Sequence, residues 1–114
     1  MKYVVLLYGD ETVWHDLDAE GREEAMGAHA AFAAAVSEHA TVLAGEGLDD
    51  TPSASTVRHD ANGEMLVTEG PFAETTEQLG GFYLVEIADR DTLTSLCALL
   101  PHWYAVEIRP VADV

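Results

Sequence analysis

The first apolar run of the chain, Tyr3 to Tyr8 (YVVLLY), contains no polar residue. A strand with one buried face alternates apolar and polar side chains, whereas an unbroken apolar run of this length is typical of a strand covered on both faces. The sequence therefore predicts a strand here whose second face needs a cover of its own.

A second pattern, with apolar residues every three or four positions, predicts a long helix. It begins after Asp18, a residue type that caps helix N-termini, and we expect it to end near Glu38 or His39. The predicted buried stripe consists of Met26, His29, Phe32 or Ala33, and Val36. His29 is thus expected on the buried side of this helix.

The same period returns between Asp89 and Leu100, where Asp89 or Asp91 is a candidate cap and Pro101 ends the helix. Its predicted core-facing residues are Leu93, Leu96, Cys97 and Leu100. Cys97 is the single cysteine, so no internal disulfide can form, and we interpret it as a buried core thiol.

Further strand-like segments fill the rest of the chain. A hairpin is expected around the turn Asn62-Gly63, whose residues tolerate positive φ. The predicted strands are Thr41 to Leu48, Ser55 to His59, Glu64 to Thr68, Gly80 to Ile87, and Trp103 to Arg109.

These elements give the order strand, helix, strand, hairpin, strand, helix, strand within 114 residues, which is one domain, residues 1–114. We predict an α+β fold of the ferredoxin-like type, β-α-β-(β-hairpin)-β-α-β. Its helices cover only one sheet face, yet Tyr3 to Tyr8 is apolar on both. The simplest cover is the sheet of a second copy, so we expect a homodimer with stacked sheets.

Charge narrows the range of partners. The chain has 21 Asp and Glu against 5 Lys and Arg, a net charge of −16, which argues against nucleic acid and against anionic membrane surfaces. No apolar run approaches the roughly 20 residues of a membrane span, and no signal peptide is visible. We therefore expect a cytoplasmic protein without a membrane partner.

Several stretches resemble one family across nearly the whole chain. They are KYVVLLYGDE, LAGEGL, TVR, LVTEGPFAETTEQLGGFYLVEI and VEIRPV. Together they are similar to the YCII-related proteins, in particular the branch known for an Asp-Gly-Pro-Phe (DGPF) motif. The resemblance implies a ferredoxin-like, dimeric α/β-barrel fold with a pocket between helices and sheet. It also implies frequent proximity to genes for sigma factors of the extracytoplasmic type, and a suspected His and Asp pair.

The chain departs from the family pattern at two places. Glu69 stands where the motif has aspartate, and Leu100-Pro101-His102 stands where relatives outside the branch show Asp-Pro-aromatic. The second difference removes one candidate acid of the implied pair. The first-helix histidine of the family is matched by His29.

The corner Glu69-Gly70-Pro71 supports two interpretations. Proline fixes φ and restricts the preceding residue, so the corner ends the hairpin arm and orients Phe72. Gly80-Gly81 then allows a close backbone approach on return to the sheet. The corner is either a rigid return with an anchoring phenylalanine or one wall of a ligand pocket.

The candidate site residues follow from the need for a group that exchanges protons near neutral pH. His29 is the candidate, with Glu46 or Glu69 as its acidic partner and with Tyr8, Phe72 and Phe82 as pocket walls. His15, His39, His59 and His102 are expected at the surface. A single interior histidine favours no metal site, and no nucleotide fingerprint is present, so we expect no cofactor.

Two function classes stay open. One is a binding or regulatory module that takes a small molecule or a protein partner. The other is a cofactor-free enzyme that performs isomerisation, proton transfer or hydrolysis around His29.

Overall fold

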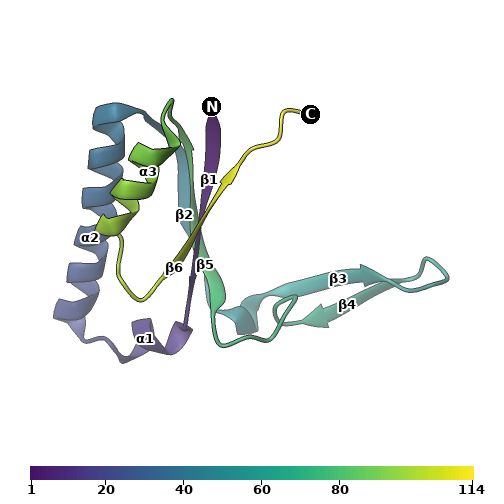
Figure 1. The fold of residues 1–114 in the computed structure, drawn as a ribbon. Coiled ribbons are helices and arrows are strands. Elements are labelled where there is room, and N and C mark those ends of the chain that lie inside the picture. The colour runs from purple at the N-terminus through teal and green to yellow at the C-terminus, as the bar shows by residue number, and fades with distance from the viewer.

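A four-stranded antiparallel sheet forms the centre of the computed structural model, which describes residues 1–114. Its order is β2-β5-β1-β6, from β2 Thr41–Gly47, β5 Gln78–Glu86, β1 Lys2–Gly9 and β6 Ala105–Pro110. Both longer helices, α2 Ala19–His39 and α3 Arg90–Leu96, lie on one face of this sheet (Figure 1). The predicted α+β class and strand-helix-strand order are confirmed, and the arrangement is consistent with a ferredoxin-like fold.

The remaining elements are short. They are α1 Glu11–Asp16, the 3₁₀ turns η1 Thr51–Ser53 and η2 Cys97–Leu99, and the strands β3 Ser55–His59 and β4 Met65–Glu69. Helix α1 was not predicted from the sequence. Asp10 begins it, because its carboxylate accepts bonds from the Thr12 amide at 3.0 Å and the Thr12 hydroxyl at 2.8 Å.

The core lies between the sheet and the helices. Strand β1 alternates, with Tyr3, Val5 and Leu7 buried against the helical layer. These side chains pack with Phe32, Val36, Val85, Ile87, Leu93 and Leu100. Apolar burial of this kind supplies most of the stability of a small domain.

The stripe predicted for α2 is partly wrong. Phe32 and Val36 are buried as expected, but Met26 is 59% exposed and Ala25 is buried in its place. One residue turns a helix by about 100°, so this shift moves Met26 out of the core. His29 is half-buried rather than enclosed.

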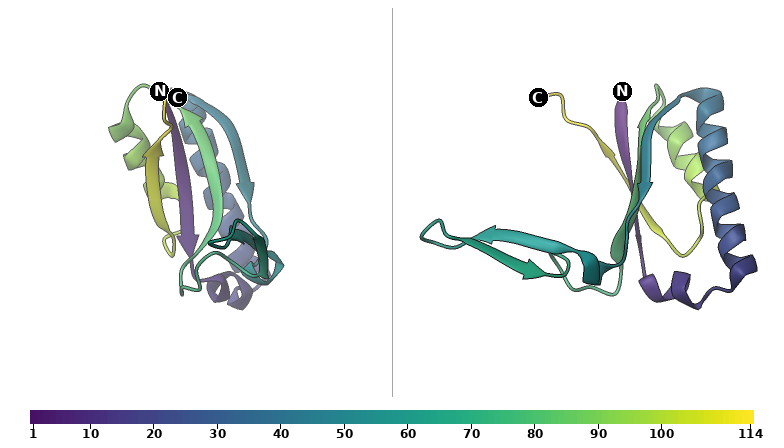
Figure 2. Two further views of the ribbon diagram at one scale, coloured as in Figure 1. Left: turned by 90° about the vertical axis from the view of Figure 1, so that its right-hand side faces the viewer. Right: turned by 180° about the vertical axis from the view of Figure 1, so that it is seen from behind.

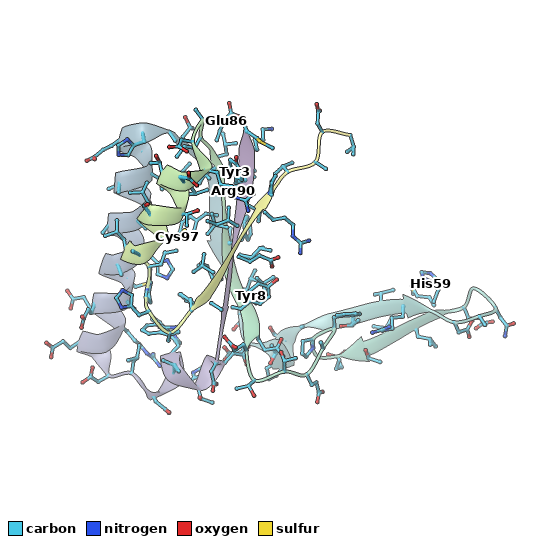
Figure 3. All side chains as sticks on the ribbon, viewed as in Figure 1. Tyr3, Tyr8, His59, Glu86, Arg90 and Cys97 are labelled. Atoms are coloured by element: carbon cyan, nitrogen blue, oxygen red, sulfur yellow. The ribbon has the colours of Figure 1, made fainter.

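The prediction for α3 agrees better with the structure than the prediction for α2 does. Asp89 caps the helix through the Asp91 amide at 3.0 Å, and Leu93 and Leu100 are buried. Figure 3 shows Cys97 within the helical layer. Cys97 is only partly buried against the core, and this burial raises the pKa of its thiol to about 11, which disfavours the reactive thiolate.

The sheet face away from the helices, here called the open face, is apolar at its centre. Val4 lies opposite Leu84, and Leu6 lies opposite Phe82. All four are only partly buried. Tyr8, labelled in Figure 3, shares this face. Its hydroxyl donates to the Glu107 carboxylate at 3.3 Å.

Strands β3 and β4 form the hairpin, residues 55–69, which projects from the sheet on the side opposite the helices (Figure 2). Its turn has Gly63 at φ +79°, as the Asn62-Gly63 pattern predicted. Its hydrogen bonds stay within residues 54–70. The hairpin thus forms no hydrogen bond with the rest of the chain.

Apolar side chains on and just after the hairpin are exposed. They are Val57, Met65, Leu66, Val67 and Phe72. Phe72 is 74% exposed and stacks only on the Arg58 guanidinium, 4.7 Å from the ring centre. It therefore does not anchor the corner in the core of its own chain.

None of the helices combines the length and the apolar character that a membrane span requires.

Candidate functional site

A cavity of about 430 Å³ lies between α1, the first half of α2 and one end of the sheet. Three strands contribute glycines to its lining, namely Gly9, Gly45, Gly47, Gly80 and Gly81. Because glycine has no side chain, this end of the sheet cannot fill the space below the helices. The volume falls in the range of small-molecule pockets.

His29 reaches this cavity from α2, and its closest partner is Tyr83 of β5. The His29 Nδ1 atom and the Tyr83 hydroxyl lie 2.7 Å apart. The Tyr83 ring also packs on Phe32, with ring centres 4.9 Å apart, and the Tyr104 ring meets His29 edge-on at 5.8 Å. The second imidazole nitrogen, Nε2, has no partner within the chain.

The Tyr83 ring can occupy its position beside His29 only because residue 45 is glycine. A Cβ atom on Gly45 would stand 2.7 Å from the Tyr83 ring, closer than such atoms approach in proteins. Gly45 lies directly opposite Tyr83 in the sheet. Any larger residue there would displace the ring from His29.

Burial sets the protonation of this cluster. Burial lowers the pKa of His29 and raises the pKa of Tyr83 and Tyr104. In each case burial removes water that would stabilise the charged form of the side chain. At neutral pH the three groups are therefore an imidazole and two phenols without charge. Such a cluster can exchange a proton with a bound molecule or hold it by hydrogen bonds.

No hydrogen bond joins His29 to either of its expected acidic partners, although Glu46 also belongs to the cavity lining. Glu46 pairs with Phe82, so strand alternation directs its side chain to the open face, while Gly45 faces the helices. An irregularity in β2 between Val42 and Ala44 changes which residues face the helices. The structure thus places Glu46 at the cavity without a bond to His29, whose partner is Tyr83.

The structure does not bring Glu69 to the cavity beside His29. Glu69 ends β4 in the hairpin and lines a separate hollow with Asp10, Glu11 and Glu74. No hydrogen bond joins it to His29, whose partner is Tyr83. Catalytic roles for His29, Glu46 and Glu69 stay predictions.

Of the expected pocket walls, only Phe82 belongs to the cavity lining, although strand alternation turns its side chain towards the open face. Tyr8 is on the open face, and Phe72 follows the hairpin. Sequence reasoning missed the aromatic walls Trp14 and Trp103. Their signal was available, since these are the only two tryptophans of the chain.

Two bonded pairs fix the rim of the cavity. The Glu11 carboxylate accepts the Thr51 amide at 2.8 Å and the Thr51 hydroxyl at 3.0 Å. His15 Nε2 lies 2.7 Å from Asp50. These contacts tie α1 to the segment after β2, which holds Trp14 in place.

No group of three or more His, Cys, Asp or Glu side chains is arranged to hold a metal ion.

Comparison with known proteins gives two matches. The sequence model of the YCII-related domain matches residues 1–114. A curated relative, "Uncharacterized protein R00369" from Rhizobium meliloti (strain 1021), is 38% identical over 116 residues, which cover 98% of this chain and 93% of the relative.

The environment of His29 predicts the direction of its titration. We expect a pKa below the usual value of about 6.5, since burial opposes the charged ring. The unfolded chain then binds more protons than the folded chain below about pH 6.5, so His29 should reduce stability as pH falls through that value towards the folded pKa. At higher pH this contribution should be constant.

NMR titration of the five histidines measures this directly, and His29→Gln identifies the resonance. Urea unfolding of both proteins between about pH 5 and pH 8 checks the linked stability. A His29 pKa above 6.5 would contradict the burial argument and would restore the case for a carboxylate partner.

Proposed function

The chain belongs to the YCII-related family, and from this premise we propose that it is a small-molecule-binding or regulatory module whose ligand occupies the cavity beside His29. The observation that carries this proposal is the cavity itself. It combines bare glycine backbone, both tryptophans of the chain and a neutral imidazole with a free nitrogen. Apolar walls with a few polar groups are typical of small-molecule sites.

We also propose that the chain belongs to the DGPF branch of the family. Glu69-Gly70-Pro71-Phe72 supports membership of the DGPF branch, with glutamate in place of aspartate. That branch is the basis for proposing a link to an extracytoplasmic-type sigma factor. With a net charge of −16, such a link would run through a protein partner in the cytoplasm rather than through DNA.

A second candidate, a cofactor-free enzyme, is favoured by the bond between His29 and Tyr83. In this case the neutral imidazole takes or gives the proton at Nε2, and the Tyr83 hydroxyl holds Nδ1. Turnover of a bound compound that His29→Gln abolishes, while binding persists, would distinguish the enzyme from the binding module.

We further propose that the protein is a homodimer. The apolar centre of the open face needs a cover, and the hairpin projects on the same side of the sheet (Figure 2). A two-stranded hairpin alone is marginally stable in water, and this one exposes Val57, Leu66 and Val67. A second copy stacked on the open face would cover the sheet of the first. The hairpin of each copy would then lie close to the other copy.

The ligand proposal can be tested through the two indole N–H resonances, because both tryptophans line the cavity. We expect a mixture of small fragments to shift the signals of Trp14 and Trp103. Gly47→Leu should abolish these shifts, since its side chain enters open space at the cavity lining. Gly27→Leu, on an exposed part of α2 with equal room, is the matched control and should keep them.

Fragments that bind Gly47→Leu as well as the unchanged protein would show that the cavity is not the site. The same conclusion would follow if bound fragments left both indole signals in place.

The dimer proposal predicts a mass of about twice 12.3 kDa by light scattering at micromolar concentration. Leu6→Lys should yield monomer, because it places a charge at the centre of the stacked faces. Ala31→Lys adds the same charge on an exposed position of α2 and should leave the dimer intact. A monomer in the unchanged protein, or a dimer in both variants, would refute the stacked arrangement.

A further inference from the structure

We propose that the cavity selects an organic cation, such as an aromatic or alkyl ammonium compound, over carboxylates and phosphates. This inference rests on the proposed function that the cavity binds a small molecule. It comes from two features of the lining, namely the aromatic walls and the sign of the charges.

The aromatic walls come from three separate parts of the chain. Trp14 belongs to α1, Tyr83 to β5, and Trp103 with Tyr104 to the segment before β6. Trp103 and Tyr104 pack together with ring centres 5.6 Å apart. Faces of tryptophan and tyrosine rings attract cations through their quadrupole, and several rings around one site give the strongest recognition of ammonium groups.

The charges of the lining also favour a cation over an anion. Asp10, Glu11, Glu46 and Asp50 line the cavity, while no lysine or arginine does. Asp10 and Glu11 are bonded to uncharged threonine groups, so their negative charge is not cancelled. Asp50 pairs with His15, which offsets its charge only when that ring is protonated. A bound anion would therefore face net repulsion.

One positive side chain, that of Arg22, contacts a residue of the cavity wall. The Arg22 guanidinium stacks on the Trp14 ring, 5.0 Å from its centre, and donates to the main-chain oxygens of Trp14 and His15. It does not line the cavity. The Trp14 ring thus already contacts one cation of the chain itself. His29 adds no charge at neutral pH, because burial lowers its pKa.

Three probes of similar size separate charge from shape. Benzyltrimethylammonium is a cation, benzyl alcohol is neutral and phenylacetate is an anion. Each is titrated against the protein at low salt and at physiological salt, with tryptophan fluorescence and the two indole N–H signals as readouts. We expect the cation to bind about tenfold more tightly than phenylacetate, with benzyl alcohol between them. Salt should reduce this difference.

A charge-neutral variant tests the contribution of the rim. Asp10→Asn keeps a residue that caps helices equally well, so α1 should persist while the charge is lost. We expect it to reduce the preference for the cation by about threefold. Asp60→Asn removes an equal charge at the far hairpin turn and serves as the matched control, with the preference unchanged.

The outcomes separate this inference from the proposed function. Phenylacetate or benzyl alcohol binding as tightly as the cation would overturn the charge preference and leave a binding cavity. Failure of all three probes to affect the tryptophans would overturn this inference. The proposed function would fail with it only if fragments also failed to shift Trp14 and Trp103 in the broader test.

Discussion

The Tyr83 ring lies over Gly45, and the arrangement of the site depends on this contact. The absence of a Cβ atom at Gly45 lets the ring lie close against β2. From there the ring packs on Phe32, which belongs to the core, and its hydroxyl meets His29. One aromatic side chain thus joins the filled part of the core to the cavity beside it.

The two ends of the sheet differ because of what their strands present to the helices. At one end Val5, Val85 and Leu93 fill the space and are fully buried. At the other end glycines leave the backbone bare, and Trp14 and Trp103 form the sides. A small protein gains stability from a filled core, so an unfilled end with polar groups favours a role in binding. The carboxylates at its rim then determine which ligands can enter.

The periodic parts of the fold could be predicted from the sequence. The apolar run of β1, the Asp18 cap of α2 and the Asn62-Gly63 turn each follow from local rules, and together they gave the element order. The short helix α1 was missed because six residues carry too little periodicity to distinguish a helix from a loop.

The partner of His29 could not be predicted for a different reason. Tyr83 lies 54 positions away in sequence, and the sheet register that brings it to His29 includes an irregularity in β2. With strict alternation from Val42, Glu46 would face the helices and could approach the imidazole. The shift between Val42 and Ala44 sends it to the open face instead. A register of this kind depends on tertiary packing rather than on local sequence.

The free energy of unfolding of two alanine variants tests the central claim that glycine at position 45 allows Tyr83 to shape the cavity. Gly45→Ala should cost about 1–3 kcal/mol, because its Cβ atom collides with the Tyr83 ring. Gly47→Ala, two residues away on the same strand, meets open space and should cost nothing or stabilise the fold by about 0.5 kcal/mol. Urea unfolding at pH 7 that gives the same value for both variants would contradict the account.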